Sequence, residues 1–172
     1  MIDREIQREL RCRFNPDGSS LREAQLRLLG ILRAVDGVCR RNGIDYFLSS
    51  GTLLGAVRHG GFIPWDDDVD IEMPLDAYRR FLEVAPDELP EHLKIQNSTT
   101  DPSFLLTFSK VRDISTAATD ADYGLSSHYN IGGYFLDVFP IAPSTSLTLH
   151  YLYGKLTYWG ILAVNRAYHT PL

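Results

Sequence analysis

Cysteine is scarce in this chain of 172 residues, where only two positions, Cys12 and Cys39, carry a thiol. Two cysteines do not make the disulfide framework that holds a small secreted domain together. Cys39 falls within a helical pattern of apolar residues, where a small buried thiol is expected. The first ten residues are charged and lack the apolar stretch of a secretory signal peptide. These absences together predict a cytoplasmic protein.

An excess of basic residues and a long hydrophobic run are also missing. The net charge is -5 and no long basic run occurs, so a broad cationic surface for nucleic acid is disfavoured. The most apolar stretch, residues 147–164, contains His150 and Lys155. It is too short and too polar to predict a membrane span. We expect a helix there that packs on the core or lies peripherally at a membrane or partner surface.

What the chain does contain is enough apolar material for one domain with a core, since 44% of its residues are hydrophobic. A capping-box pattern at Ser20 and Glu23 begins a predicted helix that Asn42-Gly43 ends. Apolar spacing and breakers predict the other elements. The expected helices are 1–15, 53–59, 75–84 and 147–166, and the expected strands are 44–48, 68–73, 93–96, 104–112 and 134–139.

The acidic run at residues 66–73 is the strongest chemical signal. Asp68 and Asp70 alternate with apolar residues, so they should project from one face of a strand. Paired carboxylates of this kind can ligate one hard cation, whereas without a cation they repel each other. The alternative, a solvated acidic loop, suits Asp66 and Asp67, which precede the strand. For Asp68 and Asp70 we favour a metal site.

Asp137 is the second signal, because it interrupts an apolar strand at residues 134–139. A carboxylate in a mostly buried strand is costly unless a metal or a hydrogen-bond donor compensates it. The alternatives are an exposed position on an edge strand or a hydrogen bond to neighbouring backbone. Since the acidic pair needs a partner strand, we place Asp137 in the same site.

Phosphate-binding candidates form a third group. Ser50-Gly51-Thr52 lies at a strand-to-helix junction, where backbone amides attract phosphate, although these residues can equally cap the helix. Lys110 and Arg112 should share one face of their strand. They would neutralise a diphosphate if that face is the acidic one, and otherwise form an exposed basic pair. Arg58, which follows the Gly51 helix, is a secondary candidate.

The stretch from Tyr46 to Ile71, with Gly-Thr-Leu-Leu-Gly followed by Trp-Asp-Asp-Asp-Val-Asp, closely resembles the LicD family. This family includes phosphocholine transferases and fukutin-type ribitol-phosphate transferases. The similarity continues through residues 108–113 and 133–140 and covers roughly residues 26–142. It implies an α+β fold similar to polymerase-β-like nucleotidyltransferases, with a mixed β-sheet flanked by α-helices.

The same resemblance implies a ligand set and a reaction. Asp68 and Asp70 correspond to paired ligands of Mg²⁺ or Mn²⁺, Asp137 to the third carboxylate, and Gly51 and Thr52 to the turn near the phosphates. The donor would be a CDP-activated alcohol such as CDP-choline, and the acceptor a hydroxyl of a glycan or cell-surface polysaccharide. Two alternatives stay open: a nucleotide-sugar glycosyltransferase with an Asp-x-Asp metal site, and a truncated, non-catalytic donor-binding relative.

We therefore expect an N-terminal extension at 1–18, a catalytic core at 19–145 and a C-terminal helix at 146–172. Family members usually continue to a C-terminal segment with a Tyr-Gly and aromatic pattern, which this sequence lacks before Leu172. Transfer needs donor and acceptor held in line, and the assigned residues all handle the donor. The expectation is that the chain binds donor with metal but transfers poorly unless an extension or a partner is supplied.

Overall fold

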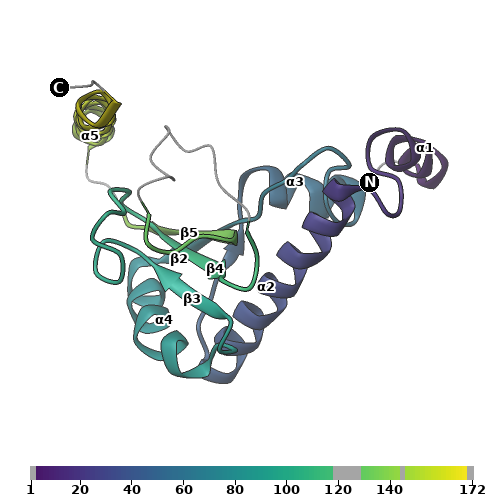
Figure 1. Cartoon of the computed structure of the whole chain (residues 1–172), viewed down its shortest axis with the longest axis horizontal. Coiled ribbons are helices and arrows are strands. Elements are labelled where there is room, and N and C mark those ends of the chain that lie inside the picture. The colour runs from purple at the N-terminus through teal and green to yellow at the C-terminus, as the bar shows by residue number, and fades with distance from the viewer. Residues whose placement is uncertain (1–2, 118–128, 144–145, 170–172) are drawn as a thin grey trace.

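The computed structural model describes residues 3–117, 129–143 and 146–169, which form a mixed α+β structure around one five-stranded sheet (Figure 1). The α+β expectation is confirmed. In chain order the elements are α1 (Arg4–Phe14), α2 (Ser20–Asn42), β1 (Phe47–Leu48), α3 (Ser50–His59), β2 (Asp70–Pro74), α4 (Leu75–Glu88), β3 (Leu93–Gln96), β4 (Ser109–Asp113), β5 (Tyr134–Ile141) and α5 (Leu147–His169).

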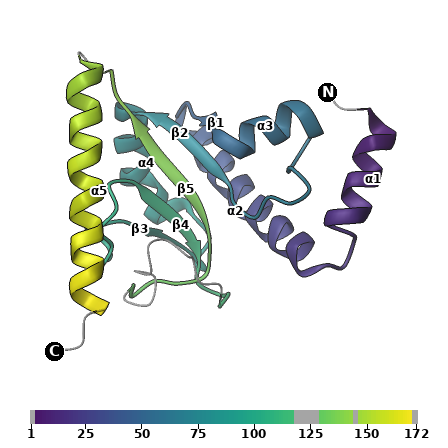
Figure 2. The same ribbon diagram turned by 90° about the horizontal axis from the view of Figure 1, so that it is seen from above.

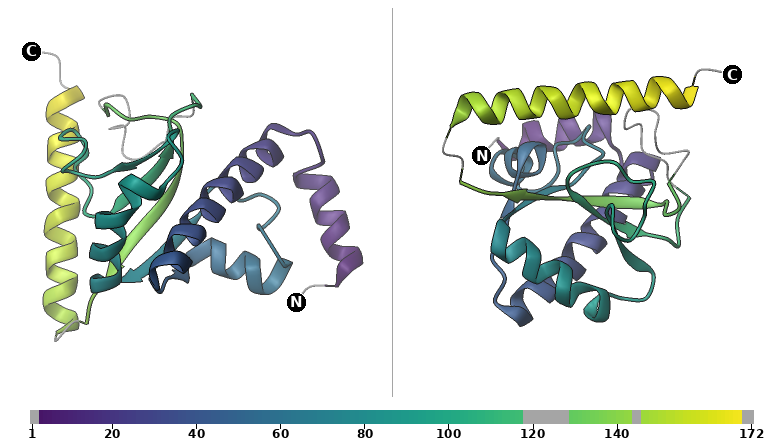
Figure 3. Two further views of the ribbon diagram at one scale, coloured as in Figure 1. Left: turned by 90° about the horizontal axis from the view of Figure 1, so that it is seen from below. Right: turned by 90° about the vertical axis from the view of Figure 1, so that its left-hand side faces the viewer.

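The hydrophobic core lies on one face of the sheet, which α2 and α4 cover (Figures 1 and 3). Along β2, Ile71 and Met73 point into this core and are 0% exposed, whereas Asp70 and Glu72 are half-buried on the other face. The alternation predicted from the acidic run is therefore confirmed within the strand. The main core side chains are Leu28, Ile31, Val35, Val38, Ile71, Met73, Phe81, Val111, Leu136 and Val138.

The strand order β1-β2-β5-β4-β3 brings the polar residues of separate strands into one row. β2 and β5 are parallel, and their register sets Asp70 opposite Asp137. The antiparallel pair β4–β5 then sets Lys110 opposite Asp137. The expected neighbourhood of Asp137 and the acidic strand is confirmed, and Lys110 joins it on the acidic face.

The strands differ in length from those predicted. β2 begins at Asp70, so Asp68 lies in the loop before it. β4 begins only at Ser109, and the chain before it turns at Asp101, which accepts hydrogen bonds from the backbone amide and the hydroxyl of Ser103. β5 continues through Pro140 to Ile141 beside β2.

Several helix boundaries also differ from those predicted. The residue that caps α2 is Ser19, whose hydroxyl accepts from the Arg22 amide at 3.2 Å, so Ser20 is already helical. α3 begins at Ser50, earlier than predicted. α4 runs past Pro86 to Glu88, since proline near a helix end removes only one backbone hydrogen bond and the burial of Ala85 favours the last turn.

The two terminal helices lie at the edges of the molecule. α1 lies beyond α3, and α5 lies on the side of the sheet opposite α2 and α4 (Figures 2 and 3). Large apolar side chains on α5 are exposed, among them Leu156 at 73% and Trp159 at 65%, so these side chains do not pack on the core. None of the described helices is both long and apolar enough to cross a bilayer.

Candidate functional site

The N-terminus of α3 holds the main chain of Asp70 from both sides. The Ser49 amide donates to the Asp70 carbonyl at 3.0 Å, and the Asp70 amide donates to the Thr52 hydroxyl oxygen at 2.9 Å. Two backbone groups of the first β2 residue are thus fixed to the turn that the sequence assigned to phosphate binding. Thr52 therefore positions the acidic strand directly.

Ser50 begins α3 with φ +48, a left-handed conformation that costs a non-glycine residue about 1–3 kcal/mol. Its side chain hydrogen-bonds the Asp70 carboxylate and so counteracts the rise in that group's pKa. The Ser49 hydroxyl is directed to Glu72 Oε1 at 2.7 Å, and no side chain caps α3. The first amides of α3 consequently lie beside the acidic residues without the capping hydroxyl that α2 has.

Asp66 belongs to this cluster, contrary to its interpretation as a solvated loop residue. Its amide closes a turn onto the Ile63 carbonyl at 3.0 Å. Its carboxylate shares a hydrogen bond with Asp68, and its buried Oδ2 has no hydrogen-bond partner. Burial, followed by the charges of Asp68 and Asp67, raises the pKa of Asp66 to about 6. The overlooked signal was its i, i+2, i+4 spacing with Asp68 and Asp70.

The pKa values of Asp68 and Asp70 are raised as well. Burial is the main reason that their pKa values are raised, and a neighbouring carboxylate adds to it, Asp67 for Asp68 and Asp68 for Asp70. Carboxyl groups with raised pKa values lose their protons more readily when a cation lies close to them. Asp67 itself is exposed, as the solvated-loop interpretation predicted.

Asp137 is already paired with a cation of the chain. Lys110 Nζ lies 2.9 Å from Asp137 Oδ1, and the two side chains are only 3% and 14% exposed. The ammonium group also lies 3.6 Å from the centre of the Phe135 ring. Burial raises the pKa of Asp137 to about 6, and Lys110 opposes that rise. Lys110 therefore neutralises the third carboxylate directly.

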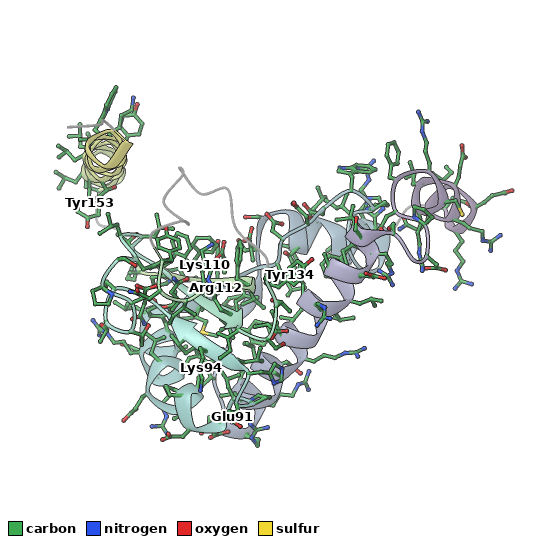
Figure 4. All side chains as sticks on the ribbon, viewed as in Figure 1. Glu91, Lys94, Lys110, Arg112, Tyr134 and Tyr153 are labelled. Atoms are coloured by element: carbon green, nitrogen blue, oxygen red, sulfur yellow. The ribbon has the colours of Figure 1, made fainter. Side chains whose placement is uncertain are left out.

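The other two basic candidates make different contacts from Lys110. Arg112 lies near Lys110 (Figure 4) but is 0% exposed. Its guanidinium donates to Gln96 Oε1 at 2.5 Å and to the Gly133 carbonyl at 3.0 Å, which places it in the polar layer of the sheet. Arg58 is exposed in the last turn of α3, about 10 Å along the helix from Gly51.

The side chains of the cluster offer the ligand atoms that a hard divalent cation prefers, although they do not surround one point. Across the described ranges, no three acidic, histidine or cysteine side chains converge closely enough to hold an ion as they stand. The groups present are carboxylate oxygens, the ligands that Mg²⁺ and Mn²⁺ take. Asp66 Oδ2 is buried without a partner, and the pKa values of Asp68 and Asp70 are raised. Asp68 and Asp70 would hold the ion, with Asp66 and Asp137 within the same cluster.

An apolar cavity of about 310 Å³ lies behind this cluster, between α2 and α3. Thr52 and Val69 line it, but none of the carboxylates does. Arg22 is the charged residue of this lining, and no carboxylate that could hold a bridging cation is part of it, so the acidic face of the sheet is the better candidate for a metal-bound diphosphate.

Gly51 leaves room for the Asp66 carboxylate, which gives a first prediction. A Cβ at Gly51 would lie 2.7 Å from Asp66 Oδ2, so Gly51→Ala should force that carboxylate to rotate while the fold survives. We expect Mn²⁺ affinity to fall by about tenfold, the usual effect of disturbing groups that support a metal site. Titration with Mn²⁺, followed by electron paramagnetic resonance, measures this.

Gly30→Ala is the matched control, because nothing lies within 4 Å of a Cβ at that position in α2. It should leave Mn²⁺ affinity unchanged and stabilise the helix by about 0.5–1 kcal/mol. Equal Mn²⁺ affinities in the two variants would show that the contact between Gly51 and Asp66 does not matter for the site.

A mixed sheet that carries carboxylates on adjacent parallel strands, beside the N-terminus of a helix, is the arrangement of a nucleotidyltransferase-type domain. Comparison with protein-family models agrees. Residues 43–153 match the model described as "LicD/FKTN/FKRP, nucleotidyltransferase domain". The chain belongs to the LicD family.

Characterised relatives include lipopolysaccharide cholinephosphotransferase LicD of Haemophilus influenzae, which is 43% identical over 103 residues, 59% of this chain and 39% of that protein. Human ribitol 5-phosphate transferase FKRP is 52% identical over 44 residues, 26% of this chain and 9% of that protein. Mannosyltransferase regulator 4 of Saccharomyces cerevisiae is 41% identical over 64 residues, 36% and 5% respectively. The chain thus spans well under half the length of these relatives.

Proposed function

We propose that this chain is a metal-dependent transferase that moves a substituted phosphoryl group, such as phosphocholine, from a CDP-activated alcohol to a hydroxyl of a glycan or cell-surface polysaccharide. The observation that carries the proposal is the row Asp70, Asp137 and Lys110 on three neighbouring strands, with Asp66 and Asp68 in the loop before it. The bacterial cholinephosphotransferase and the human ribitol 5-phosphate transferase among its relatives support transfer of phosphocholine or ribitol phosphate.

Each group has a distinct task in this proposal. Asp68 and Asp70 hold Mg²⁺ or Mn²⁺, which supplies charge neutralisation for the donor diphosphate when bound. The N-terminus of α3, at Ser50 and Gly51, has no side-chain cap, and the amides of a helix N-terminus stabilise the negative charge of a phosphate. Lys110 contributes a positive charge beside Asp137, at the site where phosphate charge would accumulate.

The transfer step balances without a further reactant. The acceptor hydroxyl oxygen forms a bond to the phosphorus of the substituted phosphoryl group, and the bond from that phosphorus to the CMP oxygen breaks. The hydroxyl proton passes to a carboxylate, for which Asp137 is the candidate because its pKa is raised to about 6. The products are the modified glycan and CMP. Such chemistry depends mainly on positioning and electrostatics.

A donor screen by calorimetry tests the proposal. The chain is titrated with CDP-choline, CDP-ribitol, CDP-glycerol and UDP-sugars, each with Mg²⁺ and with a chelator. We expect binding of one or more CDP-alcohols that depends on Mg²⁺, because the carboxylates repel a diphosphate unless a cation lies between them.

The other outcomes separate the alternatives. Binding of UDP-sugars in preference to every CDP-alcohol would overturn the proposal in favour of a glycosyltransferase. Binding of a CDP-alcohol without CMP release, in the presence of a panel of glycans, would instead indicate a donor-binding module. Release of CMP is measured by chromatography, with Asp68→Asn as the inactive reference.

A further inference from the structure

A buried amide on α2 holds the loop that carries the acidic cluster. Gln25 is 1% exposed. Its Nε2 donates to the Ile63 carbonyl at 3.2 Å and to the Asp66 carbonyl at 2.8 Å. These two carbonyls mark the two ends of the turn that Asp66 closes onto Ile63. One side chain therefore ties both ends of the turn to the long helix of the core.

The orientation of this amide is set by a second one. Asn15, also 1% exposed, donates from Nδ2 to Gln25 Oε1 at 2.7 Å. The Ser19 hydroxyl donates in turn to Asn15 Oδ1 at 2.7 Å, and the same Ser19 caps α2. Because Oε1 of Gln25 accepts from Asn15, its Nε2 must face the loop.

These and the following contacts explain the position of the corner between α1 and α2. Asn15 directly follows the last residue of α1, and its amide bonds back to the Arg11 carbonyl at 2.8 Å. The side chain of Phe14 contacts Trp65, the middle of the same loop, with ring centres 5.3 Å apart. Residues before 19, which the sequence assigned to an extension outside the core, contact the acidic loop directly through Phe14 and are linked to it through the hydrogen bond from Asn15 to Gln25.

We propose that Gln25, oriented by Asn15, is a positioning residue for the loop of residues 63–68, so that the α1–α2 corner is part of the support of the metal site. This inference rests on the proposed function where it concerns the metal. Gln25 touches no ligand; it acts by fixing the backbone at Asp66, from which the carboxylates of Asp66 and Asp68 project. Groups that orient metal ligands in this way typically change metal affinity by about 10–100-fold when they are replaced.

The test variant is Gln25→Met, which keeps the length and the packing of the side chain but removes both hydrogen bonds to the loop. The matched control is Asn42→Ala at the other end of α2, which removes hydrogen bonds to the Val38 carbonyl and to Glu88. Both variants should lower the melting temperature. Only Gln25→Met should lower Mn²⁺ affinity, by about tenfold or more, and Asn15→Leu should follow it with a smaller change.

A metal-independent readout accompanies this titration. The chain has two tryptophans, and in a Trp159→Phe background Trp65 alone reports on the loop. Acrylamide should quench Trp65 more strongly in Gln25→Met than in the parent protein, and equally in Asn42→Ala and the parent.

The outcomes are separable. Parent-like quenching of Trp65 in Gln25→Met, or Mn²⁺ affinity within twofold of the parent, would overturn the positioning role. If the parent protein itself binds no Mn²⁺, the proposed function fails. The Trp65 measurement then still decides, on its own, whether Gln25 holds the loop.

Discussion

Asp70→Asn and Asp68→Asn are each expected to abolish donor binding that depends on Mg²⁺ or Mn²⁺, while the fold survives. Both side chains are half-buried, and neither contributes to the apolar face of the sheet. An amide presents one neutral oxygen where the ion needs a charged one. Loss of several kcal/mol of interaction corresponds to a fall in affinity of about 10²–10³-fold. Calorimetry with the preferred donor, with and without Mg²⁺, measures it.

The same variants should make the metal-free protein slightly more stable at neutral pH. Burial and a neighbouring carboxylate raise the folded-state pKa of both groups, so their ionisation above that pKa opposes folding. An amide never ionises, so the gain is present at pH 7. It vanishes as the pH falls through the folded-state pKa to the unfolded-state value, where the parent protein is protonated too.

Asp76→Asn is the control for these experiments, because that carboxylate is 98% exposed on α4. It should change neither donor binding nor stability beyond about 0.5 kcal/mol. Donor binding that still responds to Mg²⁺ in both Asp68→Asn and Asp70→Asn would remove the acidic pair from the metal site and end the proposal for it.

Much of the fold was predictable because it depends on local pattern. The alternation of Asp70, Ile71 and Glu72 identified both the strand and the face on which the acidic residues lie. The helical spacing from Ala24 to Val38 identified α2 and its buried side. Strand boundaries were less accessible, since β4 and β5 end where loops and neighbouring strands stop pairing, and those contacts come from distant parts of the chain.

The site was predictable only in part, because register and burial are tertiary properties. The sequence placed Asp137 near Asp70, but the direct pairing of Lys110 with Asp137 depends on three strands lying in one order. Arg112 has the side-chain chemistry of a phosphate ligand, but its burial and its hydrogen bonds to Gln96 and Gly133 could not be predicted from the sequence. Gln25 carried one signal, a polar residue within the apolar stripe of a helix.

The acidic cluster combines two ways of compensating buried carboxylates. Asp137 has an internal cation, Lys110, at 2.9 Å. For Asp66 and Asp68, burial and neighbouring carboxylates raise the pKa values instead, which favours the neutral forms. Such an arrangement is held together by the core beneath it and by the contacts of Gln25 and Thr52. A divalent cation would relieve the repulsion between the ionised forms of Asp66 and Asp68.

Lys110→Met is expected to be among the most destabilising single substitutions in the sheet. It would leave Asp137, 14% exposed, as a buried carboxylate without its cation. Breaking a buried ion pair by removing one partner typically costs about 3–5 kcal/mol. Urea unfolding at pH 7.5 measures the loss. Lys94→Met, an exposed lysine on β3, is the control and should change the free energy of unfolding by less than about 0.5 kcal/mol.

The pH dependence of this loss separates a charge effect from a packing effect. The pKa of Asp137 is already raised to about 6 in the folded protein, and removal of Lys110 should raise it further. Protonation then stabilises the folded variant, so the loss is largest above that raised pKa and shrinks as the pH falls to about 6, below which Asp137 is protonated in the folded parent as well.

Lys110→Met/Asp137→Asn should recover most of the stability at pH 7.5, because no unpaired charge remains. Mg²⁺ should raise the melting temperature of Lys110→Met more than that of the parent, since Asp137 then has no competing ammonium group. A loss of stability that is the same at pH 5 and pH 7.5, and that neither Asp137→Asn nor Mg²⁺ reduces, would mean that Lys110 acts through the packing of its side chain on Phe135 and not through its charge.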